Sequence, residues 1–177
     1  FTGNGFDEVI DMPKIDKPVF VGSWGASDED LFRTADQHLQ QMHAAGKPFF
    51  SLIFSSSNHE PFEFPDGRIS LHEQPKNTVN NAVKYADYAL GQFIAQAKQS
   101  AYWQDTIFLI VADHDNRVYG DNLVPVEKFH IPALILGPDI EAKNISPVAS
   151  QIDLAPTLLS LLGISAQTPL IGRDFSR

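Results

Sequence analysis

Asp113 and His114 directly follow an apolar, β-branched run, "DTIFLIVA" (residues 105–112), at the point where a buried strand would reach the surface. A carboxylate oxygen and an imidazole nitrogen suit a divalent ion such as Zn²⁺ or Mn²⁺. The same side chains can also form an acid/base pair, or be only the polar end of a strand. A catalytic metal needs at least three protein ligands, whereas this chain offers two good ones. Any metal site here is therefore expected to be completed by residues outside the chain.

A second polar loop, "SSSNHEPF" (residues 55–62), also follows an apolar run and contains His59. A histidine there can act as a general acid or donate to an anionic oxygen; the alternative is a loop histidine bonded to nearby backbone. Trp24, in "GSWGAS", is either a substrate platform or a packing aromatic. Ligands of open α/β sheets bind beyond the carboxyl ends of the strands, so we expect His59, Asp113 and His114 to converge at one edge of the sheet.

These loops need a scaffold, and the hydrophobic pattern predicts one in which strands alternate with helices. Ser27 can cap a helix that Gly46 ends, and Asp153 can cap another that ends at Gly163. Alternating strands and helices predict an α/β fold with a mostly parallel sheet and helices on both faces. The expected strands cover residues 17–22, 47–55, 105–112 and 129–138, and the expected helices cover residues 27–46, 78–100 and 153–163.

Composition excludes several classes of function. The 177 residues carry a net charge of −9 without a basic cluster, which argues against nucleic acid as a partner. The absence of cysteine excludes disulfides and thiolate metal sites. No Gly-x-Ser-x-Gly elbow and no phosphate-cradling glycine loop occurs, so the sequence contains no convincing nucleophile.

Several motifs together resemble a known family. "YADYALGQFI", "DTIFLIVADHD", "HIPALILGP", "QIDLAPTLLSLLGI" and "IGRDF", in this order, resemble the C-terminal half of the catalytic domain in the sulfatase/alkaline phosphatase superfamily. "SWGASDEDLF" and "SNHEPF" are similar to the lipoteichoic-acid-synthase-like phosphoglycerol transferases within it. The resemblance implies an alkaline-phosphatase/sulfatase-like partial domain, with residues 1–177 as the C-terminal part of an extracytoplasmic catalytic domain.

The resemblance also assigns roles to residues. It implies that Asp113 and His114 are ligands of a divalent metal, Mn²⁺ or Mg²⁺ with Zn²⁺ as an alternative, and that His59 contacts the phosphoglycerol group. It places the threonine nucleophile and a further acidic ligand upstream of this chain. The superfamily usually has glycine where this sequence has Asp115. Three interpretations stay open: the turn survives because aspartate tolerates left-handed geometry, Asp115 adds a carboxylate near the ion, or it marks a divergent or inactive member.

The expected activity is metal-dependent transfer of glycerol phosphate from an anionic, phosphatidylglycerol-like lipid donor to a glycan or polymer acceptor, through a covalent threonine intermediate. An N-terminal membrane anchor outside this chain would hold the domain at the periplasmic or cell-surface side of a bacterial membrane. Two alternatives stay open. One is a sulfatase or phosphodiesterase of the same superfamily, and the other is a non-catalytic domain that keeps the fold for binding.

Overall fold

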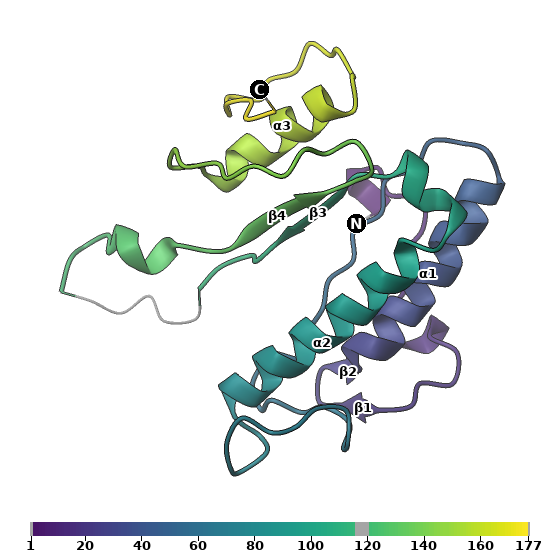
Figure 1. Ribbon diagram of the computed structural model, residues 1–177, viewed down its shortest axis with the longest axis vertical. Helices are drawn as coiled ribbons and strands as arrows, with labels where there is room; N and C mark the ends of the chain where they lie inside the picture. Colours follow the sequence, from purple (N-terminus) through teal and green to yellow (C-terminus); the bar gives the residue numbers. More distant parts are fainter. Residues whose placement is uncertain (1, 116–120, 177) are drawn as a thin grey trace. The chain divides into compact units, whose positions relative to one another are not determined.

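The computed structural model describes residues 2–115 and 121–176, and the chain divides into two compact units with the boundary between residues 104 and 105. Each unit has its own two-stranded sheet and its own helical part (Figure 1). Within the described residues, none of the helices combines the length and hydropathy that a membrane span requires.

The first unit contains a short antiparallel hairpin followed by two long helices. Helix α1 begins where the sequence predicts, because the Ser27 hydroxyl accepts a hydrogen bond from the Asp30 N–H (3.3 Å). Gly46, with φ +67°, follows its last turn. The bounds are β1 (Val21–Gly22), β2 (Gly25–Ala26), α1 (Asp28–Ala44) and α2 (Val79–Ala97), with short 3-10 helices at Thr2–Asn4, Met12–Lys14 and Ala101–Asp105.

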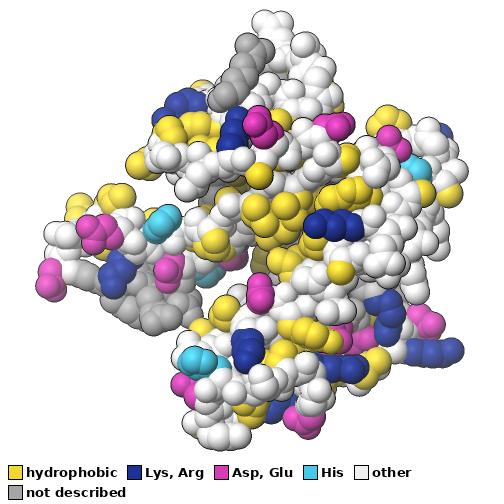
Figure 2. Space-filling model, in the orientation of Figure 1, with side chains coloured by type: hydrophobic (Ala, Val, Ile, Leu, Met, Phe, Trp, Pro, Cys, Tyr) yellow, Lys and Arg dark blue, Asp and Glu magenta, His cyan; other side chains and the backbone are white. Residues whose placement is uncertain are grey.

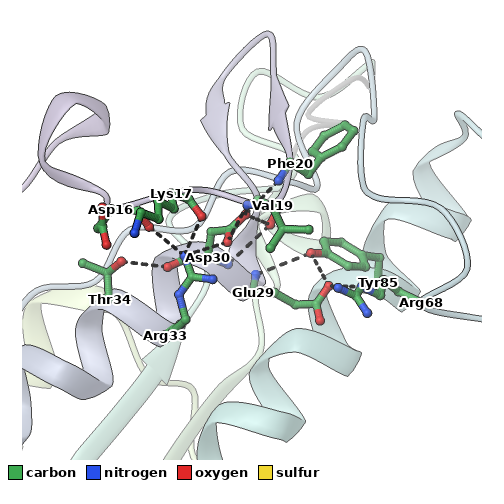
Figure 3. Close-up of polar contacts among 11 residues, drawn as sticks. Asp16, Lys17, Val19, Phe20, Glu29, Asp30, Arg33, Thr34, Arg68 and Tyr85 are labelled. Carbon is green, nitrogen blue, oxygen red and sulfur yellow. Dashed lines mark hydrogen bonds and ion pairs between the residues drawn. The ribbon is translucent and has the colours of Figure 1, made fainter.

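The core of this unit lies between α1 and α2, which run side by side (Figure 1). Phe32 of α1 stacks on Phe93 of α2 with ring centroids 5.0 Å apart. Tyr85 stacks on Phe64 at 5.1 Å, and its hydroxyl donates to the Glu29 carboxylate (3.1 Å; Figure 3). Burying one such aromatic side chain contributes about 1.5–3 kcal/mol. Small buried residues let the two helices approach closely: Ala82, Ala89 and Ala97.

A buried carboxylate ties the approach to the hairpin onto the start of α1. Asp30 accepts hydrogen bonds from the N–H groups of Val19 (3.0 Å) and Phe20 (3.1 Å) and pairs with Arg33 (2.9 Å; Figure 3). Burial acts to raise the pKa of Asp30, but these N–H donors outweigh it and hold the pKa below its usual value. Because both N–H groups are used in this way, the strand predicted at residues 17–22 is paired only at β1.

The second unit contains β3 (Phe108–Val111), β4 (Ala133–Leu136) and α3 (Leu154–Leu161), with 3-10 helices at Val126–Phe129 and Gln151–Asp153. The two strands lie within the predicted ranges but pair antiparallel, with Phe108 opposite Leu136 and Val111 opposite Ala133. The expectation of parallel neighbours is wrong for this pair. The sequence pattern identifies strands but does not specify which of them become neighbours.

The segment predicted as a strand at residues 47–55 is extended but forms no ladder with another described strand. Its alternate side chains Phe50, Leu52 and Phe54 are 71%, 58% and 69% exposed. Phe49 and Ile53 are less exposed, whereas Ser51 is exposed like its neighbours, so one apolar face of the segment is uncovered. Hydrophobic side chains are also visible on the molecular face drawn in Figure 2. A segment becomes a strand only when another backbone segment pairs with it, and a local sequence pattern does not identify that partner.

Asp153 lies at the predicted N-cap position of α3, but its side chain makes no cap hydrogen bond to that helix. Ser150 begins the 3-10 turn that leads into α3, and the Ser150 N–H donates to the Asp153 carboxylate (2.8 Å). The backbone N–H of Arg173 (2.7 Å) and its guanidinium (3.1 Å) bind the same carboxylate. The Arg173 N–H, followed by that of Ser150, holds the pKa of Asp153 below its usual value. Asp153 therefore joins the start of α3 to the C-terminal segment.

Candidate functional site

His59 lies in a turn of the first unit that backbone hydrogen bonds define. Its N–H donates to the Ser56 carbonyl (3.0 Å), and its own carbonyl accepts from the Phe62 N–H (2.7 Å). Phe62 has φ +62°, the left-handed geometry that closes the turn. The His59 side chain is exposed. The turn thus presents the ring to solvent on a defined backbone.

Trp24 and His59, the two predicted substrate-binding residues of the first unit, are in direct contact. Their ring centroids are 3.8 Å apart, and the ring planes are tilted by 42°. The Trp24 indole N–H donates to the Glu60 carbonyl (2.7 Å). Trp24 is 57% exposed, so it packs on His59 and not in the core. Together with Ser57 and Glu63, the two rings line a shallow hollow beside the β1–β2 hairpin.

The Glu60 carbonyl also lies 3.1 Å from Nδ1 of His59. With the proton on Nδ1, the ring donates to this carbonyl, and Nε2 carries the lone pair of the neutral imidazole. The alternative considered from the sequence, a loop histidine bonded to backbone, therefore describes one of the two ring nitrogens. Nε2 is the nitrogen through which His59 can accept a proton or, once protonated, donate to an anion.

Two carboxylates accept hydrogen bonds at the two ends of this turn, and the sequence had not identified either of them. Asp28, the first residue of α1, binds backbone at its start, and Glu63 accepts from the Ser23 N–H (2.6 Å) at its far end. Hydrogen bonds from the Ser23 side chain and backbone hold the pKa of Glu63 below its usual value. In the sequence, Asp28 looks like an ordinary acid in a first helical turn. Nothing in the sequence around Asp28 predicts that it contacts a loop 28 residues away.

Asp113 and His114 lie just beyond the end of β3 in the second unit. Asp113 Oδ1 accepts from the His114 N–H (2.9 Å), while Oδ2 lies 3.4 Å from His114 Nε2. Two atoms that share one ion at about 2.1 Å lie roughly 3.0–3.4 Å apart in octahedral or tetrahedral geometry. His114 Nδ1 is 3.1 Å from the Asp115 carbonyl, and a proton donated there leaves Nε2 as the ligand nitrogen. The pair fits two positions around a divalent ion.

Asp115 does not need left-handed geometry. Among the non-glycine residues of the ranges 2–115 and 121–176, positive φ angles occur at Lys17 and Phe62. Of the interpretations left open from the sequence, the one in which Asp115 adopts left-handed geometry therefore does not apply. Its backbone carbonyl instead orients the His114 ring, a contact that a residue of any type could make. The rest of this loop, residues 116–120, lies outside the described residues.

Gln151 is a residue of the second unit that the sequence analysis missed. Its side-chain amide donates to the carbonyls of Ala112 (3.2 Å) and Asp113 (2.7 Å). These bonds fasten the backbone that carries the two candidate metal ligands to the turn before α3. Partners of this kind, which hold ligands without touching the ion, tune metal affinity.

Replacing Gln151 with alanine is expected to lower Mn²⁺ affinity about 10-fold, because the carbonyls of Ala112 and Asp113 each lose their hydrogen bond from the Gln151 amide. Isothermal titration calorimetry of the full-length protein measures the change. Gln167→Ala, at an exposed position of the same unit, is the matched control and should bind Mn²⁺ normally. Equal Mn²⁺ affinity in the two variants would show that Gln151 does not contribute to metal binding.

The described residues contain no group of three or more His, Cys, Asp or Glu side chains that could hold an ion together. The prediction from the ligand count, that further ligands lie elsewhere, stays a prediction. His59 and Trp24 belong to one unit, and Asp113 and His114 belong to the other. The two units are described separately, so the convergence of His59 with the metal ligands stays a prediction.

Comparisons with known proteins extend over nearly the whole chain. Residues 1–164 match the family described as Sulfatase. The chain is 27% identical to phosphoglycerol transferase I of Xanthomonas axonopodis pv. citri over 98% of its own length. It is 26% identical to the lipoteichoic acid synthase-like protein YvgJ of Bacillus subtilis over 92% of its length. The chain spans only 26% and 30% of those two relatives.

Two solved structures resemble the chain in three dimensions. A protein of the alkaline phosphatase superfamily from Vibrio parahaemolyticus is 54% identical, with a TM-score of 0.95 over 98% of this chain and 42% of that one. The lipoteichoic acid synthase LtaP from Listeria monocytogenes is 26% identical, with a TM-score of 0.80 over 96% and 47% of the two chains. These likenesses confirm the predicted α/β fold class and the resemblance to lipoteichoic-acid-synthase-like proteins.

Proposed function

Because this chain belongs to the sulfatase family, we propose that it forms the C-terminal part of the catalytic domain of a metal-dependent phosphoglycerol transferase. Relatives named phosphoglycerol transferase and lipoteichoic acid synthase favour transfer over hydrolysis. The chain spans less than a third of those curated relatives, so the activity proposed is that of the whole protein.

The contact between His59 and Trp24 is the observation that carries the proposal. A histidine whose Nδ1 is tied to the Glu60 carbonyl offers Nε2 to a ligand, and an exposed indole stands against its ring. In this proposal His59 binds the phosphate or a glycerol hydroxyl of the donor headgroup, and Trp24 provides a flat apolar surface beside it. The compact polar headgroup of phosphatidylglycerol matches a shallow, exposed site of this kind.

Asp113 and His114 are proposed as two ligands of Mn²⁺ or Mg²⁺, with Zn²⁺ as the alternative; Gln151 would steady their backbone. Their donor set, one carboxylate oxygen and one imidazole nitrogen, suits these ions. Bound there, the ion would supply Lewis-acid stabilisation of charge on the phosphoryl oxygens and activate the attacking hydroxyl. The remaining ligands are expected outside this chain.

The proposed reaction proceeds in two balanced steps. A threonine hydroxyl outside this chain attacks the phosphorus of a phosphatidylglycerol-like lipid and loses its proton. The bond from phosphorus to the diacylglycerol oxygen breaks, and that oxygen takes up a proton, so that diacylglycerol leaves. A hydroxyl of a glycan or polymer acceptor then attacks the phosphorus and loses its proton, the bond from phosphorus to the threonine oxygen breaks, and the threonine hydroxyl is protonated again. His59 holds the headgroup through both steps. Because the donor is a membrane lipid, we place the domain on the extracytoplasmic side of a bacterial membrane, next to an anchor outside this chain.

The test uses the full-length protein with vesicles that contain phosphatidylglycerol labelled in its headgroup. We expect diacylglycerol to form together with labelled acceptor, and only when Mn²⁺ or Mg²⁺ and a glycan acceptor are present. Free glycerol phosphate formed equally without acceptor would overturn the transferase in favour of a hydrolase. No turnover and no bound metal would instead favour a non-catalytic domain.

A further inference from the structure

Asp28 is a fully buried carboxylate that acts on the loop of His59 and not on its own helix. It is only 1% exposed. Its Oδ1 accepts from the N–H groups of Ser56 and Ser57, both at 3.1 Å. In return, the Asp28 N–H at the start of α1 donates to the Ser57 hydroxyl (3.0 Å). Three hydrogen bonds thus join two segments that lie 28 residues apart in the sequence.

Helix α1 does not need this carboxylate as a cap. The Ser27 hydroxyl already accepts from the Asp30 N–H and serves as the N-cap. A buried carboxylate is costly unless hydrogen bonds compensate it. Here the donors to Oδ1 come from the loop, whereas the buried Oδ2 has no hydrogen-bond partner among the described residues. The position of Asp28 is therefore explained by its contacts with the loop and not by a role in its own helix.

What it holds is the first half of the His59 turn. Ser56 gives its N–H to Asp28, and its carbonyl accepts the His59 N–H (3.0 Å), so a single peptide segment links the carboxylate to the histidine backbone. At the other end of the turn, Glu63 accepts the Ser23 N–H, next to Trp24. The two carboxylates fix the turn on either side of the Trp24–His59 contact.

We infer that Asp28 is a positioning residue for His59: through Ser56 and Ser57 it sets where the imidazole stands relative to Trp24 and the donor headgroup. The inference rests on the proposed role of His59 in phosphoglycerol transfer. A side chain displaced by about 1 Å can lose roughly 10²-fold in rate, so the backbone on which a contacting histidine stands has a measurable effect.

A double-mutant cycle in the full-length enzyme tests the inference. Asp28→Ala should lower kcat/KM for phosphatidylglycerol about 10- to 100-fold, and Asp28→Asn, which keeps an acceptor oxygen, should recover most of the loss. In a His59→Ala background, Asp28→Ala should cost less than about 3-fold, because its effect passes through the missing ring. An equal loss in both backgrounds, or no loss in either, overturns the inference. If Asp28→Ala fails to fold, Ser57→Ala replaces it in the cycle with the same criterion.

Tryptophan emission provides a readout that does not depend on turnover. We expect contact with the His59 ring to change the emission of Trp24, so that the difference in emission between the enzyme and its His59→Ala variant reports how much of the protein has the two rings in contact. When Asp28→Ala is introduced into both proteins, this difference in emission should fall by at least about half, because the displaced backbone segment weakens the contact between the two rings. An unchanged difference contradicts the inference. If the enzyme transfers no phosphoglycerol and Asp28→Ala still shrinks the difference, the proposed function fails while the positioning role of Asp28 stands.

Discussion

Replacing His59 with alanine is expected to lower the rate of phosphoglycerol transfer by about 10²- to 10³-fold while leaving the fold intact. The loss follows because Nε2, the ring nitrogen that the Glu60 carbonyl leaves for a ligand, disappears with the side chain. The fold is spared because the side chain is exposed and the turn is held by the backbone of Ser56 and Phe62. The measurement is diacylglycerol release from labelled vesicles by the full-length enzyme, with thermal unfolding followed in parallel.

His72→Ala is the matched control for this prediction. Its side chain is also exposed and belongs to the same unit, and its backbone N–H donates to the Asn81 side chain (2.6 Å). The control should transfer phosphoglycerol at the rate of the unaltered enzyme. Equal activity in the His59 and His72 variants would mean that His59 does not contact the reacting headgroup. A parallel fall in both would point to a general disturbance of this unit.

Removing either Asp113 or His114 is expected to weaken Mn²⁺ binding by at least about 100-fold and to abolish transfer, because each would supply one of a small number of ligand atoms. Asp113→Asn preserves the shape of the side chain and tests the charge alone. Metal content after dialysis and titration calorimetry measure binding directly. At 100 times Kd, bound metal adds about 2.7 kcal/mol to the free energy of unfolding, and the variants should lose this gain.

Asp139→Ala serves as the control for the metal ligands. Asp139 is exposed and lies in the turn after β4 of the same unit, where the Ile140 N–H bonds to the Gly137 carbonyl. This variant should bind Mn²⁺ as the unaltered protein does. Full metal occupancy in Asp113→Ala would show that residues outside this chain hold the ion without its carboxylate.

The helices of this protein could be predicted because their signals are local. The Ser27 hydroxyl caps α1 through a residue three positions away, and Gly46 supplies the positive φ that follows its end. The apolar spacing along residues 78–100 likewise corresponds to α2. Interactions within one helical turn do not depend on the rest of the chain, so a sequence pattern reports them faithfully.

The strand pairings and the side-chain hydrogen bonds around the site depend on residues far apart in the sequence, and the sequence predicted them less well. The pattern placed β3 and β4 correctly but not their antiparallel pairing, and residues 47–55 have a strand's alternation without a partner strand in the described residues. Asp153 lies at the predicted N-cap position of α3, but its carboxylate binds Ser150 and Arg173 and not the first turn of that helix. Each difference depends on whether a hydrogen-bond partner from a distant segment is present, which only folding decides.

By itself, the sequence determined the residue types that can do chemistry here, namely His59, Trp24, Asp113 and His114, and the family to which their motifs belong. Only the tertiary structure decided how His59 is held. It placed the indole of Trp24 on the imidazole and the Asp28 carboxylate under the turn. The physical reason is that residue type sets which bonds a side chain can make, whereas the partner it finds is set by packing between segments far apart in the chain.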